Sequence, residues 1–178
     1  MAQNIFVLIT AVFILTNCNS KSNKLLEQSN TLDSLNTNFR YQPAKYFEKS
    51  TDTIIDSVNN LKLNIKRYSL NQGFEVAFEF GDTKEIIHFR DFACNINLLK
   101  GDSVLFSQRI QKEDFEYLIE DKDFLQRSYL SLVDFLAYNK DKKEATLKCM
   151  LVMIESDYAY IFELKYTKSG AQSITLIE

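Results

Sequence analysis

Alternating hydrophobic and polar positions run from residue 52 to the end of the chain. The clearest stretch extends from Phe74 to Phe80, where every second residue is aromatic or aliphatic. Because successive side chains of a strand point to opposite faces of a sheet, this period of two predicts β-strands. Short polar turns separate such stretches, which favours an antiparallel sheet of about seven to nine strands. The strands are expected within residues 61–65, 74–80, 86–89, 92–99, 104–110, 130–138, 145–154, 159–166 and 173–177.

One segment departs from this pattern. Residues 112–127 carry apolar side chains at helical spacing and acidic residues in the first turns, where carboxylates favour the positive end of a helix dipole. We therefore expect one principal helix over residues 112–127, lying on one face of the sheet. The predicted fold class is α+β, in a single domain of residues 52–178.

The segment before this domain has a different composition. Residues 18–51 are rich in Asn, Ser and Thr, with only a weak helical stripe. A helix this short is marginal in water, so we expect a polar tether with an end-to-end distance of about 30 Å as a flexible coil. The alternative is that residues 44–47 pack on the domain as a short helix.

The amino terminus has the pattern of an export signal. An eleven-residue stretch, Ile5 to Leu15, is broken only by Thr10, and polar residues follow Cys18 directly. The stretch is too short to span a bilayer, which needs about 20 residues, but it suits the apolar part of a signal peptide. Residues 1–17 are therefore predicted to be a lipoprotein signal peptide and Cys18 the acylated residue, with palmitate or similar chains. An ordinary secreted protein cleaved elsewhere, or a buried first segment, are the alternatives.

The other two cysteines, Cys94 and Cys149, each lie on the apolar phase of an expected strand. They would therefore face one core, and the cell envelope permits disulfides. A Cys94–Cys149 disulfide is one interpretation. The other is two separate buried thiols that pack as small hydrophobic side chains.

Charge and side-chain chemistry exclude several function classes. The formal net charge of −3 gives no basic surface for nucleic acid. The single histidine, His88, lies opposite Ile87 and Phe89 and is expected to point to solvent. No spacing of Cys and His fits zinc, and the acids of residues 113–123 lack the glycine of a calcium loop, so they are expected to be a solvated helix face. No catalytic residue, metal or cofactor is predicted.

Aromatic residues are abundant, with fourteen Phe and nine Tyr. Most lie on apolar phases, which indicates the core. Tyr158, Tyr160 and Tyr166 have an alternative interpretation as a binding platform, because tyrosine suits partly hydrated interfaces. The same segment is apolar in both phases, which predicts a central strand.

The carboxy-terminal part resembles a family of small, uncharacterised envelope lipoproteins of Bacteroidetes-type bacteria, whose domain has no known function. The features that carry the resemblance are Ile96-Asn97-Leu98, the Gly101-Asp102 turn, Val104-Leu105-Phe106, Lys112-Glu113-Asp114-Phe115, Asp157, Gly170 and Ser173-Ile174-Thr175-Leu176. The resemblance covers roughly residues 52–178. It implies an α+β lipoprotein domain and no known activity.

These observations lead to one functional hypothesis. The protein is expected to be a lipid-anchored lipoprotein of the bacterial cell envelope, on the outer membrane or a periplasmic face. Its expected role is non-enzymatic: it binds a protein partner or supports envelope assembly, and it does not bind nucleic acid. Two alternatives are a periplasmic immunity or inhibitor protein, and a hydrolase acting on glycan or peptide, which would need a cleft with convergent polar groups.

Overall fold

A computed structural model of the chain describes residues 36–154, 156–167, 170 and 172–177. By its internal contacts the chain divides into two units, Met1–Leu35 and Asn36–Glu178. The predicted signal peptide, Cys18 and the first half of the predicted tether lie outside the described residues.

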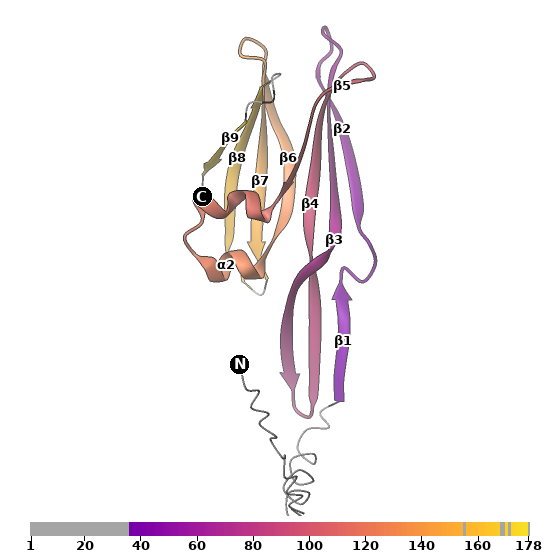
Figure 1. The fold of residues 1–178 in the computed structure, drawn as a ribbon, viewed down its shortest axis with the longest axis vertical. Coiled ribbons are helices and arrows are strands. Elements are labelled where there is room, and N and C mark those ends of the chain that lie inside the picture. The colour runs from indigo at the N-terminus through magenta and orange to yellow at the C-terminus, as the bar shows by residue number, and fades with distance from the viewer. Residues whose placement is uncertain (1–35, 155, 168–169, 171, 178) are drawn as a thin grey trace, which may run out of the picture. The chain divides into compact units, whose positions relative to one another are not determined.

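Two β-sheets make up the second unit (Figure 1). The first sheet has the order β1-β4-β3-β2, with β5 paired to the second half of β4; all its pairs are antiparallel except β1 with β4. The second sheet is an antiparallel meander in the order β6-β7-β8-β9. The strands are β1 (Asn36–Gln42), β2 (Glu48–Asp56), β3 (Leu61–Phe80), β4 (Thr83–Lys100), β5 (Ser103–Gln111), β6 (Ser128–Asn139), β7 (Glu144–Met153), β8 (Ala159–Thr167) and β9 (Gln172–Leu176).

A single hydrophobic core joins the two sheets. It combines the inward side chains of β3 and β4 with those of β6, β7 and β8. The crossover between the sheets adds buried rings, among which Phe115 lies 4.5 Å from Phe162 between ring centroids. Because burial of one such side chain contributes about 1.5–3 kcal/mol, the shared core is the main force that holds the sheets together.

The predicted α+β class with one principal helix is wrong. Strands hold 72% of the described residues and helices 9%. Residues 112–127 form a 3-10 helix, η1 (Lys112–Leu118), and a separate short helix, α2 (Lys122–Arg127). Asp121 explains the break, because its carboxylate accepts a hydrogen bond from the Phe124 amide and begins a new helix there. The fold is two β-sheets joined by this short helical crossover.

The predicted domain boundary at residue 52 also needs correction. β1 and the first four residues of β2 lie within the residues expected to form the tether. They are held by pairing, β1 in parallel to the distant β4 and β2 antiparallel to β3, which follows it directly along the chain. Local sequence carries little sign of the β1 pairing, because its partner lies far along the chain. Neither the alternative of a short helix over residues 44–47 nor a free tether describes residues 36–51.

Beyond the end of β2, strands β3 and β4 continue as one long hairpin, along which β1 pairs with β4 (Figure 1). β2 pairs only with the first part of β3, up to Tyr68, and the register shifts between Ser69 and Gly73. At Gly73 a Cβ atom would lie 1.9 Å from the Phe89 carbonyl oxygen, so only glycine fits where the two backbones approach. Residues 73–80 of β3, residues 83–90 of β4 and strand β1 are called the arm below.

Candidate binding surface

One face of the arm is lined by the aromatic side chains of β3. The register places Phe74 opposite Phe89 and Val76 opposite Ile87. The rings of Phe74 and Phe89 are stacked with their centroids 5.7 Å apart. At the tip of the arm the rings are more open to solvent. Phe80 is 66% exposed, and its ring stacks on that of Phe78. This face therefore passes from buried to exposed aromatic surface along its length.

The opposite face of the arm is built around β1. Tyr41 packs on His88 with ring centroids 4.9 Å apart, and Phe39 packs on Tyr41 at 5.3 Å. Both β1 rings stay exposed, Phe39 at 51% and Tyr41 at 41%. Large apolar groups are therefore exposed on both faces of the arm, and exposed apolar groups that lie together can mark a protein-binding site.

His88 does not point into solvent as predicted. Its side chain is 16% exposed, held between the Tyr41 ring and the Glu75 carboxylate, whose Oε1 lies 3.7 Å from Nδ1. The prediction rested on the alternation of β4 alone. It failed because β1, from the predicted tether, covers this side of the strand.

The arm also has two open edges. β4 is its central strand, paired with β3 on one side and β1 on the other. Among the described residues no strand pairs with the outer edge of β1, or with residues 73–80 of β3 on the side away from β4. Unpaired edges present backbone N–H and C=O groups, to which another strand can add.

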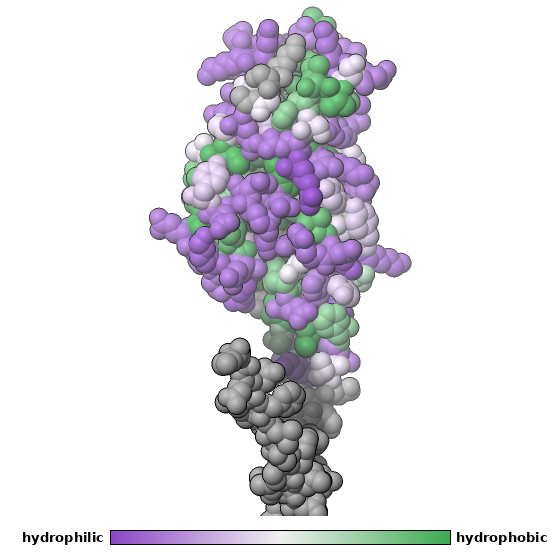
Figure 2. All heavy atoms as spheres, in the orientation of Figure 1, coloured by the Kyte–Doolittle hydropathy of each residue, from purple (hydrophilic) through white to green (hydrophobic). Residues whose placement is uncertain are grey.

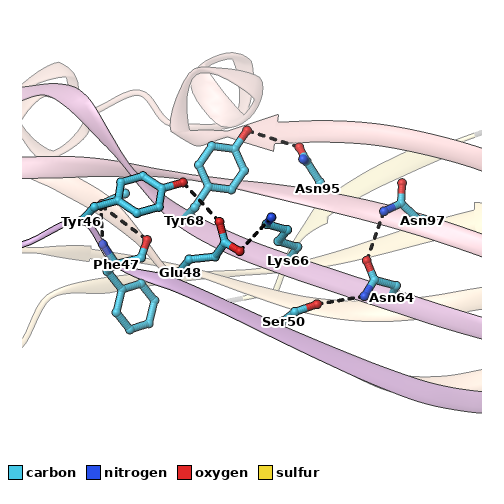
Figure 3. A network of polar contacts seen from close by, with 10 residues as sticks. Tyr46, Phe47, Glu48, Ser50, Asn64, Lys66, Tyr68, Asn95 and Asn97 are labelled. Atoms are coloured by element: carbon cyan, nitrogen blue, oxygen red, sulfur yellow. Dashed lines mark hydrogen bonds and ion pairs between the residues drawn. The ribbon is translucent and has the colours of Figure 1, made fainter.

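The outward face of the first sheet has a different character (Figure 3). Its polar side chains pair with one another across strands: Asn97 donates to Asn64 at 3.1 Å, Asn64 donates to Ser50 at 2.9 Å, and Lys66 lies 2.8 Å from Glu48. In the view of Figure 2 the visible surface of the two-sheet body is mainly hydrophilic, with hydrophobic residues in small groups. Because the polar side chains of the outward face already pair with one another, we interpret this face as a solvated surface.

The three tyrosines considered as a platform do not form one. Tyr166 is 3% exposed and packs under Phe106 in the core. Tyr158 and Tyr160 contact each other and the buried ring of Phe124. Only Tyr158, at 56%, is largely exposed. β8 lies between β7 and β9, which confirms the central strand predicted for this segment.

Cys94 and Cys149 lie in the shared core, as their phases indicated. Both are fully buried and are free thiols in the structure. Burial raises the pKa of both thiols, that of Cys94 to about 12, so neither is a reactive thiolate at neutral pH. The disulfide stays a prediction, and a mass measurement after alkylation without reductant distinguishes the two states.

The acidic residues of the crossover are exposed, which confirms the predicted solvated face. The described residues contain no group of three or more metal-ligating side chains. Within the same residues, no helix combines the length and apolar character needed to cross a membrane. These findings leave the arm as the most distinctive surface of the described chain.

No protein-family model matches this sequence, and no curated protein matches it. The resemblance to envelope lipoproteins therefore stays a hypothesis.

Sequence reasoning missed the two β1 aromatics. Phe39 and Tyr41 both lie in the segment that was expected to be a polar tether. A signal was present, since Phe39 and Tyr41 alternate with polar Asn38, Arg40 and Gln42. This stretch is too short to be told apart from a polar linker.

Proposed function

We propose that this protein is a lipid-anchored lipoprotein of the bacterial cell envelope that binds a protein partner through its arm, without enzymatic activity. The observation that carries the proposal is the arm itself. It combines exposed aromatic side chains on both faces with two unpaired strand edges.

The arm suits an extended protein segment better than a small molecule. A partner strand can add to the outer edge of β1 or β3, so that backbone hydrogen bonds give affinity. Side chains of that strand would then lie beside Phe39 and Tyr41, or beside Phe78 and Phe80. These apolar positions supply the selectivity that backbone pairing lacks.

A narrower form of the proposal is an immunity or inhibitor protein that blocks a toxin or hydrolase in the periplasm. It uses the same surface and differs only in the partner. The small acidic chain, with net charge −3, is compatible with this form but does not single it out.

Replacing both Phe39 and Phe80 by Ser is expected to reduce recovery of the partner roughly tenfold or more in co-purification from solubilised envelopes. The reason is that each ring is expected to bury most of its apolar area in the complex, at about 1.5–3 kcal/mol per side chain. The matched control is the double replacement of Val58 and Val104 by Ser. These residues are also exposed, at 85% and 57%, but lie outside the arm. Equal loss in both double variants would contradict the proposal.

A further inference from the structure

Arg67 occupies a position where the alternation of β3 calls for a core side chain. Leu61, Leu63 and Ile65 precede it on the same phase and are buried. In the sheet register Arg67 pairs with Cys94, which is fully buried. The guanidinium group is therefore directed between the two sheets and not into open solvent.

Aromatic rings surround this guanidinium group. Its central carbon lies 4.8 Å from the centroid of Phe92 and 5.1 Å from that of Phe47. Its Nη1 donates one long hydrogen bond, of 3.5 Å, to the carbonyl oxygen of Leu130. Among the described residues it has no ion pair with a carboxylate. Several of its N–H donors are therefore left to solvent or to a ligand.

The electrostatic surroundings of Arg67 do not neutralise it. Burial lowers the pKa of Arg67 and is the largest influence on it; the negative charge of Asp134 opposes this more weakly. A guanidinium nevertheless stays protonated at neutral pH. A partly buried cation without a counter-ion is costly, and the two rings offset that cost only in part.

A second arginine lies at the same place. Arg90 donates to the Pro43 and Leu70 carbonyl oxygens at 3.3 and 3.4 Å and to Asn71 Oδ1 at 3.0 Å, and its guanidinium lies over the Tyr41 ring. All these partners are neutral. Its position is therefore fixed while its positive charge stays uncompensated among the described residues.

The two arginines line one cavity of about 270 Å³. Half of its other lining residues are aromatic, these residues come from both sheets, and no Asp or Glu is among them. The aromatic residues are Phe47, Phe89, Phe92 and Tyr129. A cavity of this size is slightly below the range of about 300–1,000 Å³ usual for drug-sized ligands, so its occupant is small.

We propose that this cavity binds a carboxylate carried on an aromatic or branched apolar group the size of one amino-acid residue. The planar guanidinium of Arg67 suits a planar carboxylate, which it can bind with two parallel hydrogen bonds. The aromatic walls suit the apolar group, and Ser131, which also lines the cavity, supplies a hydroxyl. The cavity borders the arm at Gln42, Phe89 and Arg90, but the exposed rings of Phe39, Tyr41 and Phe80 are not among its lining residues. The inference does not rest on the partner proposed above.

The test is calorimetric titration of the full-length protein in a non-ionic detergent. The probes are N-acetyl-L-phenylalanine, its uncharged amide, phenyl phosphate, and a short peptide that ends in phenylalanine with a free carboxylate. The variants are Arg67→Met, Arg67→Lys and, as matched control, Arg109→Met. Arg109 lies exposed on β5, outside the cavity.

The proposal expects saturable binding of N-acetyl-L-phenylalanine to the wild type and to Arg109→Met. The amide should bind roughly tenfold more weakly or worse, because it lacks the charge-assisted hydrogen bonds. Arg67→Met should lose binding. Arg67→Lys keeps the charge but lacks the planar guanidinium, and it should bind about tenfold more weakly. This variant still tests the proposal if Arg67→Met does not fold. Tighter binding of the peptide would identify a polypeptide end as the source of the carboxylate, and equal binding would identify a free acid.

Three results would overturn the proposal. These are no binding of either carboxylate probe to the wild type, equal binding of acid and amide, and tighter binding of phenyl phosphate than of the carboxylate. Unchanged binding by a folded Arg67→Met variant would overturn it as well.

Discussion

Replacing Cys18 by Ala is expected to release the protein from the membrane or to leave its signal peptide uncut. Each buried methylene of an acyl chain contributes about 0.8 kcal/mol, and one chain alone holds a protein only marginally. The two or three chains of a lipoprotein cysteine make attachment effectively permanent. In detergent phase partitioning of cells, the native chain should therefore enter the detergent phase, and the released Cys18→Ala protein should enter the aqueous phase.

Cys149→Ala is the matched control for this experiment. It also removes a thiol, but from the buried core of the described unit, and partitioning should not change. If the Cys18→Ala protein stays in the detergent phase at its mature mass, the predicted anchor is wrong.

Lys112→Met is expected to lower the free energy of unfolding by about 3–5 kcal/mol at pH 8. Lys112 Nζ lies 3.0 Å from Asp91 Oδ1, and the two side chains are only 11% and 8% exposed. The lysine also donates to the Ser128 carbonyl oxygen at 3.3 Å, so the pair ties β4 to the start of β6. Removing the lysine leaves a buried carboxylate without its cation.

The loss should depend on pH. Burial already raises the pKa of Asp91, against the opposing charge of Lys112, and the substitution raises that pKa further. An acid whose pKa is raised in the folded state lowers the free energy of unfolding as the pH rises. This loss begins near the pKa of the unfolded chain, about 3.9 for Asp, and is complete above the pKa of the folded state. Denaturant unfolding of Lys112→Met should therefore show a smaller loss at pH 5 than at pH 8.

Two variants check this explanation. Lys66→Met breaks an exposed pair with Glu48 and should cost no more than about 1 kcal/mol at either pH. Adding Asp91→Asn to Lys112→Met should abolish the additional pH dependence. A Lys112→Met protein as stable as the wild type would show that the pair does not hold β4 to β6.

The alternation of the chain was enough to predict most strands and the inward residues of the core. It correctly identified the hairpin turn at Gly101, which joins β4 to β5 with φ of +58°. It could not show that the strands divide between two sheets, because a period of two reveals which side chains share a face but not which strands are neighbours. The same limit hid the parallel pairing of β1 with β4.

The arm shows a second limit of sequence reasoning. The stretch from Phe74 to Phe80 alternates as regularly as Leu61 to Ile65, yet only the latter is buried by the second sheet. Apolar residues at every second position of a strand indicate that one face of the sheet is buried. They do not tell whether that face is buried by the same chain or by another protein. Arg67 carried the clearest signal that was missed, as a charged residue on the phase of three buried aliphatic ones.

Photocrosslinking in living cells tests the central claim, that the arm holds a protein partner. A photoreactive amino acid would be placed at position 80, at the arm tip, and in a second strain at position 104 on β5; the native residues are similarly exposed, at 66% and 57%. We expect a discrete adduct with another envelope protein from position 80 and not from position 104. No adduct from position 80, or the same adducts from both positions, would contradict this claim.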